Sequence, residues 1–417
     1  MLFRSIDKDR YVVISGHYDS IALRRTPNQA VRTDDAGPAS PADADPLAPG
    51  VADDGSGTAA TMELARVMSQ YQFDKSIVFV TFAAEEVGLN GSRAYAAKAR
   101  EDKMQIEAVL NNDIVGSDIS GNGRSANNHL RVFSEGPDDS TSRSLARYTK
   151  EIAERYMPSM TVDLIFRHDR FGRGGDHSSF VAQGFTAVRL TTPSENFANQ
   201  HTATDTFANA SVPYTTRVAR MNAAVLATLA LAPKPPVVAN PRPPGGGGGG
   251  ARGGARGDAA GGTGTGAAAG ADTATGRGGR AGATDTAATG GANPPAGAGR
   301  GGRGGRGPGL SRGNGYDAVM RWAMPNPEPD LAGYSILIRD TTSPVWQKEI
   351  YVGNVTEYNI PDLSIDDIVI GVRAIDKDGN PSLVSAYEMA PTRLVDANQP
   401  QPQRPPAATG TGGGGGQ

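Results

Sequence analysis

The apolar run Ile77-Val78-Phe79-Val80-Thr81-Phe82-Ala83-Ala84 is followed directly by Glu85 and Glu86. A short apolar run of this kind is typical of a buried strand. The end of such a strand should be partly buried, and adjacent buried carboxylates repel each other unless a cation is present. The sequence therefore predicts a metal site in which one carboxylate binds the ion and the other takes a proton from activated water.

Two other strand-like runs also end in side chains that can bind metal. Residues 11–16 lead to His17 and Asp19, and residues 108–112 lead to Asp113. In an open α/β sheet, ligands bind beyond the carboxyl ends of the strands, so residues far apart in sequence converge there. Asp19 favours a metal-binding role for His17, because a metal-bound imidazole usually donates its other N–H to a carboxylate.

Two turns add further candidates. Asp53 lies in a glycine-rich turn, residues 50–57, before a helical pattern whose first N–H groups favour negative charge. His201 lies in the turn of residues 200–205, where Asp205 can orient its imidazole. Each piece alone could be structural, since Asp-Gly turns and single histidines usually are. Together, two imidazoles, three carboxylates and one additional carboxylate suit a pair of zinc ions and a base.

Composition limits the classes of function. The 417 residues carry a net charge of -3, so the overall charge gives no reason to expect a nucleic acid or an anionic membrane as partner. There are no cysteines, which excludes disulfides, thiolate zinc sites and cysteine nucleophiles. No apolar run in the sequence is long enough to span a bilayer. Residues 1–7 lack the apolar core of a signal peptide.

The pattern divides the chain into four parts. Residues 1–233 alternate between strands and helices, which predicts an α/β domain with a mixed, mainly parallel central sheet flanked by helices. Residues 234–314 are rich in Gly, Ala, Pro and Arg and cannot bury enough apolar surface to offset the entropy of ordering, so they predict a disordered linker. Residues 315–396 alternate apolar and polar side chains, with an early Trp322, and predict a separate all-β sandwich. Residues 397–417 are predicted to be a disordered tail.

The linker contains Arg-Gly-Gly repeats, a composition that also occurs in RNA-binding tails. The repeats lack the interleaved aromatic side chains that stack on bases. A flexible spacer is therefore the preferred interpretation, with RNA binding as a weaker alternative. Residues 24–49 are rich in Pro, Ala and Asp, and predict either a lid or a surface loop between two ligand motifs.

The ligand motifs together resemble the M28 family of zinc-dependent aminopeptidases, over nearly all of residues 8–232. The segments that carry the resemblance are Gly16–Ser20, Asp53–Gly57, Ala84–Ser92, Asn112-Asp113, Gly175–Phe180 and Gln200-His201. Family members usually have helices and a strand before the first ligand motif, so the catalytic domain is expected to be shortened at its N-terminus and to expose apolar surface.

The resemblance implies two zinc ions bridged by Asp53. His17 and Asp113 would complete one metal site, and Glu86 and His201 would complete the other. Glu85 would be the general base and later the general acid. Asp19 and Asp205 would hold the ligands in place. The substrate pocket would be lined by Arg173, Asp176, His177 and Gln200.

Four positions carry a competing interpretation, have no matching role or depart from the family pattern. His177 has an alternative role as a hydrogen-bonded wall residue. His129 and His168 have no matching role and are interpreted as surface or structural residues. Gln200 stands where several family members have a tyrosine that assists the oxyanion. Polarisation of the carbonyl by the metal would therefore contribute more to stabilising the oxyanion.

The implied function is removal of N-terminal residues from peptide or protein substrates by attack of metal-activated water. Other hydrolases of the same fold, a carboxypeptidase or a dipeptidase, remain open, as do a single-zinc glutaminyl cyclase and an inactive binding or adhesion protein. The β unit resembles a fibronectin type III domain, especially at residues 371–380, and would bind a surface polymer or a protein. The resemblance and the tethered β unit imply an extracellular or periplasmic location.

Overall fold

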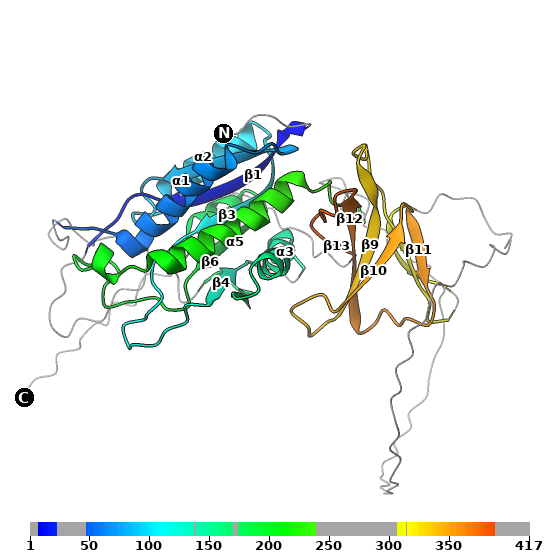
Figure 1. Cartoon of the computed structure of the whole chain (residues 1–417). Helices are drawn as coiled ribbons and strands as arrows, with labels where there is room; N and C mark the ends of the chain where they lie inside the picture. The colour runs from blue at the N-terminus through cyan, green and yellow to red at the C-terminus, as the bar shows by residue number, and fades with distance from the viewer. Residues whose placement is uncertain are drawn as a thin grey trace, which may run out of the picture. The chain divides into compact units, whose positions relative to one another are not determined.

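The computed structural model of the chain describes residues 7–22, 47–136, 139–169, 174–238, 307–313 and 315–387. One six-stranded sheet lies in the first part of the chain, and two antiparallel sheets of four and three strands lie in the C-terminal part (Figure 1). The predicted combination of an α/β domain with separate β sheets is confirmed. Among the described residues, no helix is long and apolar enough to cross a lipid bilayer.

The large sheet has the strand order β2-β1-β3-β6-β4-β5. Its strands are β1 (Asp7–His17), β2 (Lys75–Phe82), β3 (Gln105–Asn112), β4 (His129–Phe133), β5 (Thr161–Ile165) and β6 (Ala187–Thr191). β1 runs parallel to β2 and β3, and β3 runs parallel to β6. β4 is antiparallel to β6 and parallel to β5, so the sheet is mixed and mainly parallel, as predicted.

Five helices cover the two faces of this sheet (Figure 1). One core contains side chains of α1 (Ser56–Met68), α3 (Thr141–Tyr156) and α5 (Val212–Leu231). A second core, on the other face, contains side chains of α2 (Asn90–Glu101) and α4 (Asp176–Ala182). Short helical turns occupy Val51–Gly55 and Phe207–Asn209. β1 is buried on both faces at Val12, Val13 and Ile14, which explains why these three consecutive residues are all apolar.

The strand register brings three predicted ligand segments to one edge of the sheet. His17, the last residue of β1, pairs with Phe82, the last residue of β2. Ser15 of β1 pairs with Asn111 near the end of β3. Because these three strands are parallel neighbours, the residues that follow them meet in one crevice.

The C-terminal part contains seven strands in two sheets, in the orders β10-β9-β12-β13 and β11-β8-β7. They are β7 (Gly309–Arg312), β8 (Ala318–Arg321), β9 (Leu331–Asp340), β10 (Lys348–Gly353), β11 (Glu357–Ile360), β12 (Ile368–Asp376) and β13 (Ser385–Ala386). Trp322 is buried in their common core, where its ring lies 5.4 Å from the ring of Tyr334.

The boundaries of this β part differ from the predicted ones. β7 lies within residues 234–314, the range predicted as a linker, because Gly309–Arg312 pairs with β8. Val238, also in that range, packs into the β core. The remaining predicted linker, residues 239–306, and the predicted tail lie outside the described residues.

Candidate metal centre

Asp53 lies between two histidines, and each of its carboxylate oxygens faces a different imidazole. Its Oδ1 is 3.3 Å from Nε2 of His17, and its Oδ2 is 3.0 Å from Nε2 of His201. The side-chain amide of Gln200 donates a hydrogen bond to the same Oδ2 at 2.9 Å. Asp53 is buried, so these contacts occur away from bulk water. This is the arrangement expected of a carboxylate that bridges two ions.

Two overlapping groups of metal-capable side chains share Asp53. The first contains His17, Asp53 and Asp113, and the second contains Asp53, Glu86 and His201; within each group the ligand atoms all lie within 4.8 Å of one another. Nε2 of His17 is 3.9 Å from Oδ1 of Asp113, and Nε2 of His201 is 3.0 Å from Oε2 of Glu86. Two donors on one tetrahedral zinc lie about 3.4 Å apart. The five predicted ligands therefore meet at one place and fit two ions.

Asp19 organises the crevice through two different parts of its structure. Its carbonyl oxygen is 3.0 Å from Nδ1 of His17, which directs Nε2 of that imidazole toward the cluster. Its carboxylate accepts hydrogen bonds from the backbone N–H groups of Glu85 at 3.1 Å and Glu86 at 3.2 Å. The predicted supporting residue thus holds the imidazole through its backbone and the Glu85-Glu86 segment through its side chain.

Asp205 holds the turn that carries Asp53. Its carboxylate accepts hydrogen bonds from the backbone N–H groups of Ala52 at 2.9 Å and Asp53 at 3.0 Å. These bonds fix the backbone of a turn that would otherwise place two N–H groups in a partly buried position without acceptors. The supporting role predicted for Asp205 is therefore exerted on the turn.

Asp54 is a buried residue of the site whose role sequence reasoning missed. Its carboxylate accepts backbone N–H groups from His17 at 3.1 Å, Gly57 at 3.0 Å and Ile114 at 3.1 Å. Burial, with Asp113 and Asp53 nearby, raises the pKa of Asp54 well above its usual value. An added Cβ at Gly57 would lie 2.4 Å from Oδ2 of Asp54, so only glycine fits there. The sequence signal was an acidic residue paired with Asp53 just before a helix.

Replacing Asp54 with alanine should lower the free energy of unfolding by about 3 kcal/mol or more, because three buried N–H groups lose their acceptor. Urea denaturation followed by circular dichroism measures this change. Asp102→Ala is the matched control, since Asp102 is exposed and forms an ion pair with Lys98 at the surface. A loss for Asp54→Ala no larger than for the control would show that Asp54 does not hold these segments together.

Arg189 is a second buried residue that the sequence analysis did not assign. Arg189 lies on β6, and its Nη2 atom is 3.1 Å from Oδ1 of Asp113. The same guanidinium contacts the carboxylate of Asp169 and donates to the carbonyl of Gly174. Arg189 therefore orients Asp113 and offsets part of its charge. Its only signal in the sequence was a charged side chain inside an apolar strand.

The centre holds a surplus of buried negative charge. Burial, with the neighbouring Asp53, raises the pKa of Glu86 to about 7. Burial alone would lower the pKa of His201, but Asp53 and Glu86 raise it to about 11. Burial raises the pKa of Glu85 well above its usual value, and Asp113 and Glu86 add to this increase. The neighbouring carboxylates contribute to each of these increases, and a cation would relieve their mutual repulsion. Nitrogen and oxygen donors suit zinc, cobalt or manganese.

The predicted pocket residues have different surroundings. Asp176 and His177 begin α4 and are fully buried. Burial raises the pKa of Asp176 to about 7, and the nearby Asp113 and Asp19 add to this increase. Gln200 donates a hydrogen bond to the carboxylate of Asp53. Arg173 lies outside the described residues.

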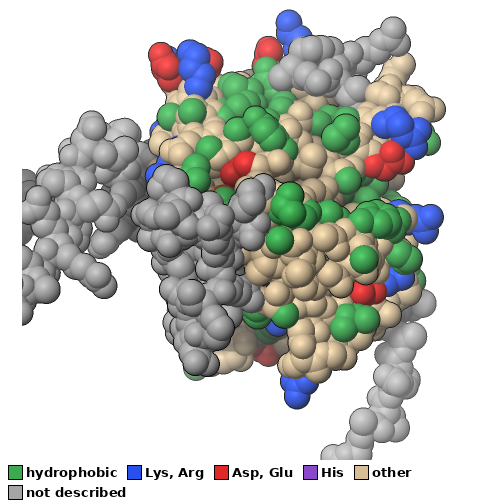
Figure 2. All heavy atoms as spheres, turned by 90° about the vertical axis from the view of Figure 1, so that its left-hand side faces the viewer, with side chains coloured by type: hydrophobic (Ala, Val, Ile, Leu, Met, Phe, Trp, Pro, Cys, Tyr) green, Lys and Arg blue, Asp and Glu red, His purple; other side chains and the backbone are tan. Residues whose placement is uncertain are grey.

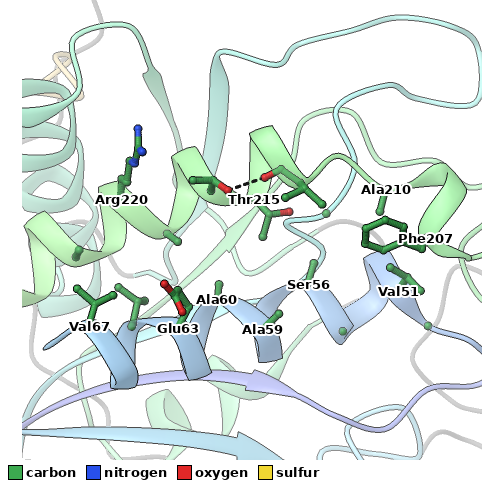
Figure 3. Close-up of a pocket in the computed structure, with 18 of the residues that line it drawn as sticks. Val51, Ser56, Ala59, Ala60, Glu63, Val67, Phe207, Ala210, Thr215 and Arg220 are labelled. Atoms are coloured by element: carbon green, nitrogen blue, oxygen red, sulfur yellow. Dashed lines mark hydrogen bonds between the residues drawn. The ribbon is translucent and has the colours of Figure 1, made fainter. Parts of the chain in front are cut away.

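A large apolar groove of about 790 Å³ lies between α1 and α5 (Figure 3). Val51, Ala60, Val67 and Phe207 are among the residues that line it, with the charged Arg220 at α5. None of the five candidate ligands lines this groove. The groove is therefore distinct from the metal centre and is a separate apolar surface.

Comparison with known proteins gives one family. The family model of peptidase family M28 matches residues 3–226. A probable zinc metalloprotease of Pyrenophora tritici-repentis is 28% identical over 404 residues, covering 90% of this chain and 74% of that protein. A probable zinc metalloprotease of Pyricularia oryzae is 30% identical over 405 residues, covering 89% of this chain and 64% of that protein.

Among solved structures, the LapA aminopeptidase of Legionella pneumophila is 25% identical, with 53% of this chain and 51% of that chain covered and a TM-score of 0.41. The chain spans about half to three quarters of the length of the relatives it matches, from 51% to 74% of the first two. Since the family match extends over more than half of the 417 residues, the chain belongs to peptidase family M28.

Proposed function

We propose that this chain is a zinc-dependent aminopeptidase with two zinc ions per catalytic domain. The observation that carries the proposal is Asp53, whose two oxygens face His17 and His201 within two complete ligand groups. The similarity to probable zinc metalloproteases supports zinc as the metal. When bound, the two ions would lower the pKa of a water molecule and polarise the scissile carbonyl.

Glu85 is the proposed general base. It is buried beside the ligand groups, with Oε2 4.0 Å from Nε2 of His17, and its backbone N–H is held by Asp19. Burial raises its pKa, so the carboxylate is a stronger base than an exposed glutamate. It accepts a proton from the attacking water and then delivers that proton to the leaving amine.

The charge of the site favours an N-terminal amine as the recognised group. Glu85 and Asp176 are buried acidic side chains near the centre that are not among the five candidate ligands, and their carboxylates would attract the ammonium group of a peptide N-terminus. A carboxypeptidase instead needs a cation for the C-terminal carboxylate. Arg189, a buried cation beside the centre, is already paired with Asp113 and Asp169.

Apolar side chains exposed near the ligands favour substrates with apolar residues. Tyr18 follows His17 and Val87 follows Glu86, and both are more than half exposed. Figure 2 shows that hydrophobic side chains form groups on the face that it views. Leucyl and phenylalanyl substrates are therefore the first choices for assay.

Acetylation of the substrate amine should reduce kcat/KM by at least about 100-fold, because it removes the charge that the acidic side chains recognise. Leucyl p-nitroanilide and its N-acetyl derivative form the matched pair. Equal hydrolysis of both substrates would argue for an endopeptidase or a different hydrolase.

The overall proposal is tested with a panel of aminoacyl p-nitroanilides, assayed before and after chelation, beside measurement of bound zinc. We expect two zinc ions at the Asp53 cluster, loss of activity on chelation and recovery on adding zinc. One ion at this cluster, with cyclisation of N-terminal glutamine in place of hydrolysis, would favour a glutaminyl cyclase.

The proposed organisation has a catalytic domain at residues 1–233, a linker and a fibronectin type III-like accessory domain that reaches to about residue 396. Seven strands in two sheets around Trp322 support the accessory domain. The exposed rings of Tyr316 and Tyr351 support binding of a surface polymer or protein in an extracellular or periplasmic setting.

A further inference from the structure

We infer that Glu135, His168 and His177 form an additional metal site, separate from the Asp53 cluster, for a divalent transition-metal ion such as Zn²⁺. Nδ1 of His168 is 2.7 Å and Nε2 of His177 is 3.7 Å from Oε1 of Glu135. One ligand atom from each residue lies within 4.8 Å of the other two. These distances bracket the separation of about 3.4 Å between two donors on a tetrahedral zinc.

His177 is the residue that points most strongly to a ligand. Its side chain is 0% exposed, and within the described part of the chain neither ring nitrogen has a hydrogen-bond partner. A buried polar group without a partner destabilises the folded state. Burial lowers the pKa of His177 to about 3, so the ring is neutral, the form in which imidazole binds metal. An ion beside Glu135 would satisfy Nε2.

The other two residues complete a site with one open position. Glu135 follows β4, and Oγ of Ser178 donates a hydrogen bond of 3.0 Å to its Oε1, which orients the carboxylate as in many metal sites. His168 follows β5 and is about half exposed, so water reaches the site from that side. Two imidazoles and one carboxylate, with water as a fourth ligand, are a common set for zinc.

The inferred site is distinct from the Asp53 cluster but close to it. An added Cβ at Gly175 would lie 2.9 Å from Oδ2 of Asp113 and 3.4 Å from Nδ1 of His177, so little more than the backbone at Gly175 separates them. Gly174, next to it, accepts a hydrogen bond from Arg189, which pairs with Asp113. A bound ion would therefore tie the segments after β4 and β5 to the start of α4, beside the wall of the catalytic centre.

The test is the zinc content of the full chain and of His168→Gln, with His129→Gln as the matched control. His129 also forms an imidazole–carboxylate pair, 3.0 Å from Asp163, but no described third ligand completes a group around it. Each protein is stripped with a chelator, reloaded with Zn²⁺ and passed through a desalting column before mass spectrometry. We expect His168→Gln to bind one ion fewer per chain than the wild type, and His129→Gln to bind the same number. Equal zinc in the wild type and His168→Gln would overturn the inference.

Two further variants distinguish loss of this site from failure of the proposed function and from misfolding. Asp53→Ala should retain the one ion of this site, so failure of the Asp53 cluster does not remove the signal. His177→Gln should show the same loss as His168→Gln, and the exposed position of His168 makes that variant safe for folding. Thermal unfolding with and without Zn²⁺ gives a second readout: zinc should raise the Tm of Asp53→Ala but not of Asp53→Ala/His168→Gln. An equal increase in both would also refute the site.

Discussion

Replacing Glu85 with glutamine should reduce kcat by about 10²- to 10⁴-fold and leave the zinc content unchanged, since a general base contributes rate enhancements of this size. Glutamine keeps the shape of the side chain, and the hydrogen bond from the backbone N–H of residue 85 to the carboxylate of Asp19 remains possible. It cannot take a proton from water. The candidate ligands of the two metal groups that share Asp53 are other residues, so metal binding should persist.

This result is measured as kcat and KM on leucyl p-nitroanilide, together with zinc content by mass spectrometry. Glu63→Gln is the matched control, because Glu63 is exposed and forms an ion pair with Arg66 at the surface. KM should change little in Glu85→Gln, since the residue acts on the attacking water. Turnover close to that of the control would rule out Glu85 as the base, and loss of zinc together with activity would make it a ligand.

Replacing Asp53 with alanine should remove both zinc ions from the cluster and reduce activity to background. Each of its oxygens faces a different histidine, so one substitution removes a ligand from both groups. His17→Ala removes a ligand from the group that contains Asp113, and His201→Ala from the group that contains Glu86. Each histidine variant should therefore lose chiefly one ion.

The comparison of these variants distinguishes a bridging carboxylate from an ordinary ligand. Zinc content after desalting is the measurement, and circular dichroism checks that each variant is folded. Asp205→Asn is a useful control, since Asp205 contacts the backbone of the turn through hydrogen bonds that an amide oxygen can partly retain. If Asp53→Ala lost no more zinc than His17→Ala, the bridging role would be wrong.

The part of the site that sequence reasoning identified has local signals. His17, Glu86 and Asp113 follow strand-like runs, and the parallel pairing of β1 with β2 and β3 brings their ends together. Asp53 and His201 lie in turns recognised from glycine-rich or polar sequence. Such signals depend on residue type and on position after a strand, both of which can be read without coordinates.

The residues that were missed act through contacts between distant segments. Asp54 accepts an N–H group from residue 17, which is 37 positions away, and another from residue 114, which is 60 positions away. Arg189 reaches Asp113 from the neighbouring strand β6, although the two residues are far apart in the sequence. His168 was interpreted as a surface or structural residue, yet it lies beside Glu135 and near His177. No local pattern encodes which backbone group or carboxylate will stand opposite such a side chain.

The amino-acid sequence by itself determined the α/β fold, the β part around Trp322 and the set of candidate ligands, because strand periodicity and polar residues after apolar runs are properties of neighbouring residues. Only the tertiary structure decided which oxygen of Asp53 faces which imidazole, that Asp19 holds His17 through its carbonyl group, and that the linker range contributes a strand. The physical reason is that these features depend on the path of turns and on partners far away in the chain, such as the 152 positions between Asp53 and Asp205.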